Sequence, residues 1–335
     1  MRVEQLSLSE WDELLPDSNC GVFHTPEGLR VLDRHAAGDL HVFGGFEGEQ
    51  PIGLLPLFIR ERFNFRTVLS PPPGFGVRDL GPVFLPVSPK RRKQEKVEKN
   101  FIKEIIDTVD ADHRMTIFRM SGGTFYRDPR PFWWAGFNVY PTFTYQLDLE
   151  SAEPDEVLRS FSKSVRRDIR DATEADVTVR GNGGLADVRE IYETIEARFD
   201  DQEKRLPISW EYTQDMYESL GDRAQVYVAE SPEGEFLSGI VVLYSNDTAY
   251  FWNGGTGRTD HSFSVNSLLH WRIMEDIIYG QTKFDIERYD FQTANNERIV
   301  RYKSKFNGEL VPNYRIESTG LPMAIVKKAY RMIAE

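Results

Sequence analysis

Four cations lie within about two helical turns of one another near the middle of the chain. In the segment Ser162-Lys-Ser-Val-Arg-Arg-Asp-Ile-Arg-Asp-Ala172 they are Lys163, Arg166, Arg167 and Arg170. A helix over this segment would bring Lys163, Arg166 and Arg170 to one face, because side chains three and four residues apart are neighbours. Such a stripe can hold a phosphate or diphosphate through paired hydrogen bonds. The alternative is a solvent-exposed helix face whose local partners are Asp168 and Asp171.

A glycine-rich segment, Phe251-Trp-Asn-Gly-Gly-Thr-Gly-Arg258, ends one expected strand just before an expected helix. Its place indicates a loop that could cradle a phosphate at the helix N-terminus. Trp252 and Asn253 would then lie beside the ligand. The alternative is a flexible exit from a hairpin.

Several other kinds of site are disfavoured. The six histidines form no His-x-x-x-His pair and Cys20 is the only cysteine, so we expect neither a metal site nor a disulfide. Neither a Gly-x-Ser-x-Gly elbow nor a phosphate-binding P-loop is present. Thr25 and Pro26 are typical of a helix start, and Trp133-Trp134 indicates core or interface.

An internal repeat indicates which elements must position these residues. Strands at 41–46 and 52–59 flank a Glu-Gly-Glu turn, and strands at 225–230 and 237–244 flank a second one. Each pair is followed by a third strand, by a helix with apolar residues three and four apart, and by a last strand. Those last strands are expected at 115–118 and 283–286.

The repeated order predicts an α/β fold with a mixed sheet in each of two tandem units. The helix between the third and last strands predicts a right-handed crossover, so these two strands are parallel while the first three are antiparallel. We expect residues 1–140 to form the first unit and residues 141–335 to form the second, with the two packed as one body.

This layout resembles a tandem GNAT fold, and the second half resembles the FemABX-type aminoacyltransferases together with the related BioF-named acetyltransferase domains. The resemblance rests on Tyr145-Gln-Leu-Asp-Leu149, the cationic segment 162–172, Tyr289-Asp-Phe291 and Tyr302-Lys-Ser-Lys-Phe-Asn-Gly308. In the last of these, Tyr302 replaces a Phe of the family pattern and Asn307 replaces a Gly.

The resemblance implies where the reaction centre lies. It places Lys303 where a cation would stabilise charge on the acyl oxygen or on a phosphate, with Tyr302 and Lys305 beside the substrate. Asp290 becomes a candidate for the base that deprotonates the attacking amine. By the same analogy, His24 at the first helix start would face the acceptor. The alternative for Lys303 and Lys305 is that they are ordinary surface lysines. The alternative for Asp290 is a structural pair with Arg288 or Arg301, and the segment of His24 could be only a helix cap.

The resemblance also implies the activity: an acyl or aminoacyl group moves from acyl-CoA or aminoacyl-tRNA to an amine, on a small-molecule or lipid-linked precursor of the cell envelope or of a surface polysaccharide. No tightly bound cofactor is expected. The short span between Asp200 and Arg223 leaves no room for the long helical arm of many FemABX-type chains, which favours a small acyl donor over tRNA. The alternative is an inactive tandem GNAT that serves as a binding module.

Composition limits the partners and the location. The 335 residues carry a net charge of −12, which argues against general DNA binding. Residues 1–145 hold 18 basic and 19 acidic side chains, and the remainder holds 23 and 34. No apolar run approaches the ~20 residues of a membrane span and the N-terminus lacks a signal-like apolar region. We therefore expect a cytoplasmic protein that could act at the inner face of the membrane.

Overall fold

The computed structural model describes residues 1–62, 65–257 and 262–319. The chain divides into two compact units, of which the second is Phe143–Val311 and the first combines Met1–Thr142 with the described residues from Pro312 onward. This differs from the expected division at residue 140. The C-terminal segment joins the first unit because its strand pairs there, Arg315 opposite Ser121 and Ile316 opposite Met120.

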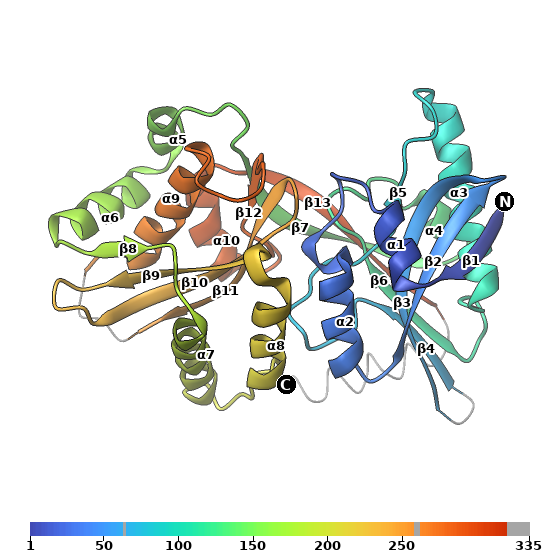
Figure 1. Ribbon diagram of the computed structural model, residues 1–335, viewed down its shortest axis with the longest axis horizontal. Helices are drawn as coiled ribbons and strands as arrows, with labels where there is room; N and C mark the ends of the chain where they lie inside the picture. Colours follow the sequence, from blue (N-terminus) through green and yellow to red (C-terminus); the bar gives the residue numbers. More distant parts are fainter. Residues whose placement is uncertain (63–64, 258–261, 320–335) are drawn as a thin grey trace. The chain divides into compact units, whose positions relative to one another are not determined.

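The first unit is built from a mixed sheet with helices packed against it (Figure 1). Its elements are β1 (Arg2–Leu6), α1 (Leu8–Leu14), η1 (Val22–His24), α2 (Pro26–His35), β2 (Asp39–Glu47), β3 (Gln50–Arg62), β4 (Phe65–Ser70), β5 (Val83–Phe84), α3 (Arg91–Thr108), β6 (Thr116–Ser121), α4 (Arg130–Trp134), the beginning of β7 (Asn138–Asp148) and the end of β13 (Glu309–Glu317).

The second unit contains the rest of β7, then α5 (Pro154–Ser160), α6 (Lys163–Glu174), β8 (Thr178–Arg180), α7 (Leu185–Asp200), α8 (Trp210–Leu220), η2 (Gly221–Arg223), β9 (Ala224–Glu230), β10 (Phe236–Tyr244), β11 (Thr248–Thr256), α9 (Val265–Ile278), β12 (Arg288–Asp290), α10 (Glu297–Lys303), η3 (Ser304–Phe306) and the beginning of β13. Helices α5, α6 and α9 lie over one face of its sheet, and α7 and α8 lie over the other (Figure 1).

The two units repeat one topology. In the first, β2 and β3 pair antiparallel, as do β3 and β4, and β4 pairs parallel with β6 after the crossover through α3. In the second, β9 and β10 pair antiparallel, as do β10 and β11, and β11 pairs parallel with β12 after the crossover through α9. The mixed sheet and the repeated strand order are as predicted.

One local expectation was wrong. The last strand of the second repeat was expected at 283–286 but lies at Arg288–Asp290, next to its parallel partner at Thr248–Tyr250. The cationic segment is helical as expected: α6 begins at Lys163, and Ser162 caps it by accepting the N–H of Val165.

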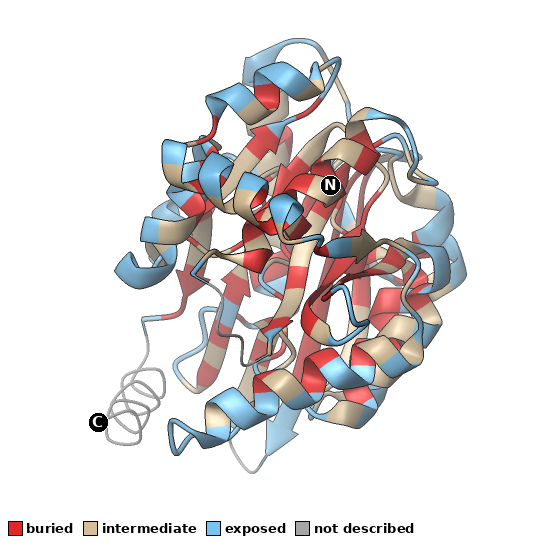
Figure 2. Ribbon diagram, turned by 90° about the vertical axis from the view of Figure 1, so that its left-hand side faces the viewer, coloured by how far each residue is buried: buried red, intermediate tan, exposed pale blue. Residues whose placement is uncertain are grey.

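Buried residues concentrate in the strands and on the inner faces of the helices (Figure 2). In the second unit, Tyr227, Ala229, Val242 and Tyr289 belong to one core cluster with residues of α6 and α9. Within residues 1–62, 65–257 and 262–319, no helix combines the length and the apolar character that a bilayer crossing needs.

Candidate functional site

The strands β11 and β12 separate within the second unit. Their parallel pairing covers Thr248 to Tyr250 against Arg288 to Asp290 and stops there. Beyond that point β11 continues against β10 as far as Thr256. The chain after β12 stays beside β7 instead, since Phe291 N–H donates to Tyr145 O (2.9 Å) and Ala294 N–H donates to Phe143 O (2.6 Å). The sheet thus opens after Tyr250 and Asp290.

A β-bulge lies where the strands separate. Val241 of β10 is opposite Asn253, but Val242 is opposite Phe251, so Trp252 is the extra residue of β11. The indole of Trp252 is buried and packs against Tyr212 of α8 with ring centroids 6.3 Å apart. A bulge re-aims the backbone groups around it. Here it does so in the segment of β11 that no longer pairs with β12.

Asp290 is the last residue of β12 that pairs with β11. Its buried carboxylate accepts hydrogen bonds from the Thr144 hydroxyl, from Gln146 Nε2 (2.9 Å) and from the backbone N–H of Gln292 (2.6 Å). Burial raises the pKa of Asp290 above its usual value, although these bonds and the charge of Lys303 act in the opposite direction. Neighbouring strand residues face opposite ways, and Tyr289 faces α9, so Asp290 points to the α7 side.

Lys303 has internal partners. Its ammonium donates to the carbonyl oxygens of Phe291 (2.5 Å), Gln292 and Thr293 (3.1 Å), and it lies 5.6 Å from the centroid of the Phe251 ring. Gln292 and Thr293 have φ values of 52° and 34°, a backbone conformation that residues other than glycine rarely adopt. Lys303 therefore secures the strained turn through which the chain leaves β12.

Aromatic side chains fill the space behind this turn. His270 of α9 is buried, shares a hydrogen bond with the Tyr289 hydroxyl (2.8 Å from Nδ1), and contacts Phe251 and Phe291 at centroid distances of 4.9 and 5.1 Å. Burial and the nearby positive charge of Lys303 lower the pKa of His270 to about 3. The imidazole is therefore neutral at physiological pH, and it supports the turn by packing.

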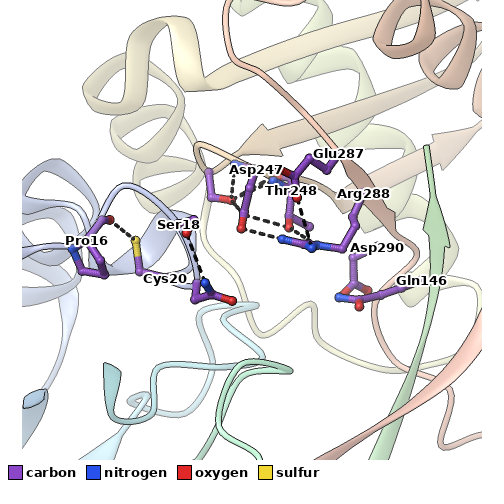
Figure 3. Close-up of polar contacts among 11 residues, drawn as sticks. Pro16, Ser18, Cys20, Gln146, Asp247, Thr248, Glu287, Arg288 and Asp290 are labelled. Carbon is purple, nitrogen blue, oxygen red and sulfur yellow. Dashed lines mark hydrogen bonds and ion pairs between the residues drawn. The ribbon is translucent and has the colours of Figure 1, made fainter. Parts of the chain in front are cut away.

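An ion pair holds the paired ends of β11 and β12 together. Arg288 donates to Asp247 (2.6 Å), whose buried carboxylate also accepts from Ser245 and Thr248 (Figure 3). The backbone carbonyl of Asp247 accepts the N–H of Glu287 (2.9 Å). The strands are therefore clamped just before they separate at Asp290, which keeps the opening in a fixed place.

The cationic stripe on α6 lies on the surface, as helical spacing predicted. Lys163, Arg166, Arg167 and Arg170 are exposed, while Val165 and Ile169 are buried. Arg170 already donates to Asp171 (2.8 Å). In the part of the chain that the structure describes, Lys163, Arg166 and Arg167 have no ion-pair partner.

The segment containing Lys303 and the start of α6 are in contact. Ser162 N–H donates to Lys305 O (2.8 Å), and the rings of Phe161 and Phe306 pack edge to face at 5.3 Å. The structure therefore gathers in one unit most of the residues selected from the sequence: Asp290, Trp252, Asn253, Tyr302, Lys303, Lys305 and the α6 stripe. Arg258 lies outside the described residues.

His24 lies in the first unit and is fully buried. Its Nδ1 accepts the N–H of Gly21 (3.2 Å), so Nε2 carries the proton and donates to Gly81 O (2.9 Å). Burial lowers the pKa of His24 to about 4 despite these bonds. These contacts join the start of α2, capped by Thr25 as expected, to the loop that holds Gly81.

Sequence reasoning missed the partners of Asp290. Thr144 and Gln146 are two residues apart in β7, so their side chains lie on the same face of the strand. This spacing, on either side of Tyr145, was the signal from which a polar face could have been predicted. The clamp at Asp247 and the buried His270 had no such signal, because each depends on pairing between segments distant in sequence.

Comparison with known proteins finds a family match in the second unit and several similar solved structures. Residues 159–304 match the model of a family described as the acetyltransferase (GNAT) domain. The crystal structure of FemX superposes with a TM-score of 0.70 at 12% identity, covering 97% of this chain and 99% of FemX. The chain has a tandem GNAT fold like that of FemX. Among curated proteins, none matches the sequence significantly.

Other solved structures agree on the fold of this tandem GNAT protein. A tandem GNAT protein from the clavulanic acid biosynthesis pathway has a TM-score of 0.50 at 13% identity, covering 94% of this chain and 97% of that one. The C-terminal domain (DUF2156) of a protein assigned as lysylphosphatidylglycerol synthetase in Agrobacterium fabrum has a TM-score of 0.54 at 13% identity, covering 92% and 95%. The expected fold is confirmed. The match of residues 159–304 to an acetyltransferase domain agrees with the expected acyltransferase class.

Proposed function

We propose that the second unit transfers an acyl or aminoacyl group from an activated donor to an amine, at the opening between β11 and β12. The observation that carries this proposal is that β11 continues past Tyr250, with its bulge at Trp252, after β12 has turned away. Backbone N–H groups of β11 on that side can polarise an acyl carbonyl, as preorganised donors do in other acyl transfers.

In the proposed reaction, the amine nitrogen attacks the acyl carbon and forms a C–N bond. The thioester C–S bond of acyl-CoA, or the ester C–O bond of aminoacyl-tRNA, breaks as the tetrahedral intermediate collapses. The amine loses a proton on the way, and the leaving thiolate or alkoxide takes one up. Positioning the two reactants and stabilising the oxyanion supply most of the acceleration in such a reaction.

Asp290 is the proposed base, directly or through one water. It is the last paired residue of β12, and burial raises its pKa, which makes its carboxylate a better proton acceptor. Lys303 acts with it as a positioning residue, because its ammonium is held by the carbonyls of the turn at 291–293. Tyr302, on the helix that carries Lys303, and Asn253 would line the acyl group.

The α6 stripe is the proposed anchor for the anionic part of the donor. Arg166, Arg167 and Lys163 are exposed, and the start of α6 contacts the segment that contains Lys303 and Lys305. The loop between α7 and α8 holds no helical arm, which favours acyl-CoA over aminoacyl-tRNA. The resemblance to FemABX proteins supports an amine acceptor at the cell envelope, reached from the cytoplasm.

The decisive experiment supplies the purified protein with radiolabelled acyl-CoA or with charged tRNA, each with a panel of amine acceptors. We expect label transfer from one donor, and Asp290→Asn should lower turnover roughly 100-fold or more. Turnover of the native protein should rise with pH as Asp290 loses its proton, because only the carboxylate can accept one. The Asp290→Asn variant should lose that dependence.

The matched control is Asp285→Asn, which alters an exposed carboxylate on the segment before β12. It should leave both turnover and its pH dependence unchanged. An equal loss in both variants, or none in either, would remove Asp290 from the mechanism. No transfer from either donor to any amine, in a folded protein, would leave a binding module as the better description.

A further inference from the structure

Helix α3 of the first unit presents a row of cations to solvent. Its rotation is fixed because Val97, Phe101 and Ile105 are buried in the core. Side chains on the opposite side repeat at intervals of four, three and four residues, so they lie in one line along the helix. These side chains, all exposed, are Arg92, Lys96, Lys99 and Lys103.

This row stands out in an acidic protein. Residues 90–103 contain seven cations and two acids, in a chain whose net charge is −12. Five of the protein's 12 lysines lie in these 14 residues. Lys103 pairs with Asp107, but Arg92 and Lys96 have no ion-pair partner within the described ranges. The surface of α3 is therefore locally positive, although the protein as a whole is negatively charged.

Two tryptophans lie beside the row. Trp133 and Trp134 of α4 are 66% and 56% exposed. Of the two expected places, core or interface, the core is therefore excluded. Helix α4 packs beside α3 (Figure 1). The Lys99 ammonium lies 5.7 Å from the Trp134 ring centroid, so the aromatic and cationic groups form one surface.

The tryptophans are held in place. Arg130 donates to Glu95 of α3 (2.8 Å) and to Asp128 (2.7 Å), which fastens the start of α4 to α3. Its guanidinium also lies 5.4 Å from the centroid of the Trp134 ring. Two large indoles fixed in contact with water are unfavourable, because their apolar surface is hydrated. Burial of this surface against a partner would therefore lower the free energy.

We propose that this surface, formed by Arg92, Lys96, Lys99, Lys103, Trp133 and Trp134, docks the protein on an anionic phospholipid bilayer. Indoles lie at the level of lipid headgroups because their rings are apolar and their N–H groups can still be hydrated. Lysines near an anionic bilayer bind through its surface potential, and a single short row with two aromatic anchors gives reversible binding. Three of the four cations are lysines, whereas recognition of nucleic-acid phosphates favours the bidentate guanidinium.

The test is flotation of the full-length protein with vesicles of phosphatidylcholine, with or without phosphatidylglycerol. We expect binding to the anionic vesicles alone, weakening as salt is raised. Arg92→Gln with Lys96→Gln should weaken it by roughly fivefold for each charge removed. Trp133→Ala with Trp134→Ala should weaken it about tenfold, and should abolish the quenching of tryptophan fluorescence by brominated lipid.

The matched control is Lys204→Gln with Arg205→Gln, two exposed cations of the second unit, which should bind vesicles like the native protein. Circular dichroism melting confirms that each variant is folded. Equal losses in the control and in the α3 variant would overturn the proposal, as would vesicle binding unaffected by any variant. Binding of tRNA in place of vesicles, lost in the α3 variant, would also overturn it and assign the surface to RNA. None of these outcomes depends on whether acyl transfer occurs.

Discussion

A lysine ammonium has three N–H donors, and three successive carbonyls accept those of Lys303. All three donors of the ammonium are therefore directed at the turn at 291–293, where Gln292 and Thr293 have unfavourable positive φ values. The same turn places the N–H of Gln292 on Asp290. A residue that the family resemblance places at the substrate thus shapes the proposed site through the backbone.

Lys303→Met should destabilise the protein by about 3 kcal/mol, because buried carbonyls lose their donors. Its turnover should also fall, since the turn and Asp290 are no longer held. Urea unfolding measures the first effect and the label-transfer assay the second.

Lys204→Met, at an exposed lysine of the same unit, is the control and should alter neither quantity. A Lys303→Met protein that is as stable as the native one but inactive would show that the ammonium acts on the substrate instead.

His24 makes the protein sensitive to acid. Its folded pKa of about 4 lies below that of an unfolded chain, ~6.5, so the unfolded state takes up the proton first. This contribution to stability is present above pH ~6.5 and is lost as the pH falls toward 4, by up to about 3 kcal/mol. The lowered pKa of His270 acts in the same direction.

Urea midpoints between pH 4 and 7 measure this slope, which should flatten in His24→Gln. The exposed His113→Gln is the control and should keep the native slope. Identical slopes in all three proteins would show that His24 does not contribute.

For individual residues, the sequence predicted which of them lie in the same unit but not which hydrogen bonds they make. Asp290, Tyr302 and Lys303 could be selected because they stand in short motifs with a fixed order. The hydrogen bonds of Asp290 to Thr144 and Gln146 span more than 140 residues of sequence. Burial of Lys303 and His24 also depends on packing, which periodicity in a single segment does not reveal.

At the scale of the element, helix α6 offers an internal comparison. Arg166 and Arg170 lie on the same exposed stripe, but only Arg170 is paired with Asp171. Arg166→Ala should raise the Michaelis constant for the anionic donor at least tenfold, the value of about one charge-assisted contact, without changing stability.

Arg170→Ala should have a smaller effect, because its guanidinium is partly neutralised already. Steady-state kinetics with varied donor concentration distinguish the two variants. Equal and unchanged Michaelis constants in both would show that α6 does not bind the donor.

Whole elements were predicted well where a long periodic pattern or a cap marked them. Helix α2 begins at Pro26 with Thr25 as its cap, and α9 follows the spacing of its apolar residues. Short elements were misplaced: β12 has three residues, too few for alternation to set its limits, and its position depends on pairing with β11. The bulge at Trp252 likewise exists only relative to β10.

At the scale of the molecule, the division between the units gives a direct test. In the first unit, β13 supplies Ile316 to the core and pairs with β6. A chain that ends at Val311 should lose hydrogen-exchange protection at β6 and α3 while β9 and β10 keep theirs. Ile316→Ala, a milder variant, should cost roughly 2–5 kcal/mol.

A chain that ends at Thr319 retains β13 and serves as the control. Unchanged protection of β6 after truncation at Val311 would show that the first unit folds without this strand. Loss of protection across both units would show that they unfold together.

The return of β13 to the first unit sets an order of events during synthesis. A ribosome delivers Met1–Thr142 first, but the strand that pairs with β6 is not made until after Val311. The second unit, continuous from Phe143 to Val311, is complete before that strand emerges. The half of the protein that is translated first is therefore the half that finishes folding last, and until then the edge of β6 that β13 will cover waits for its partner.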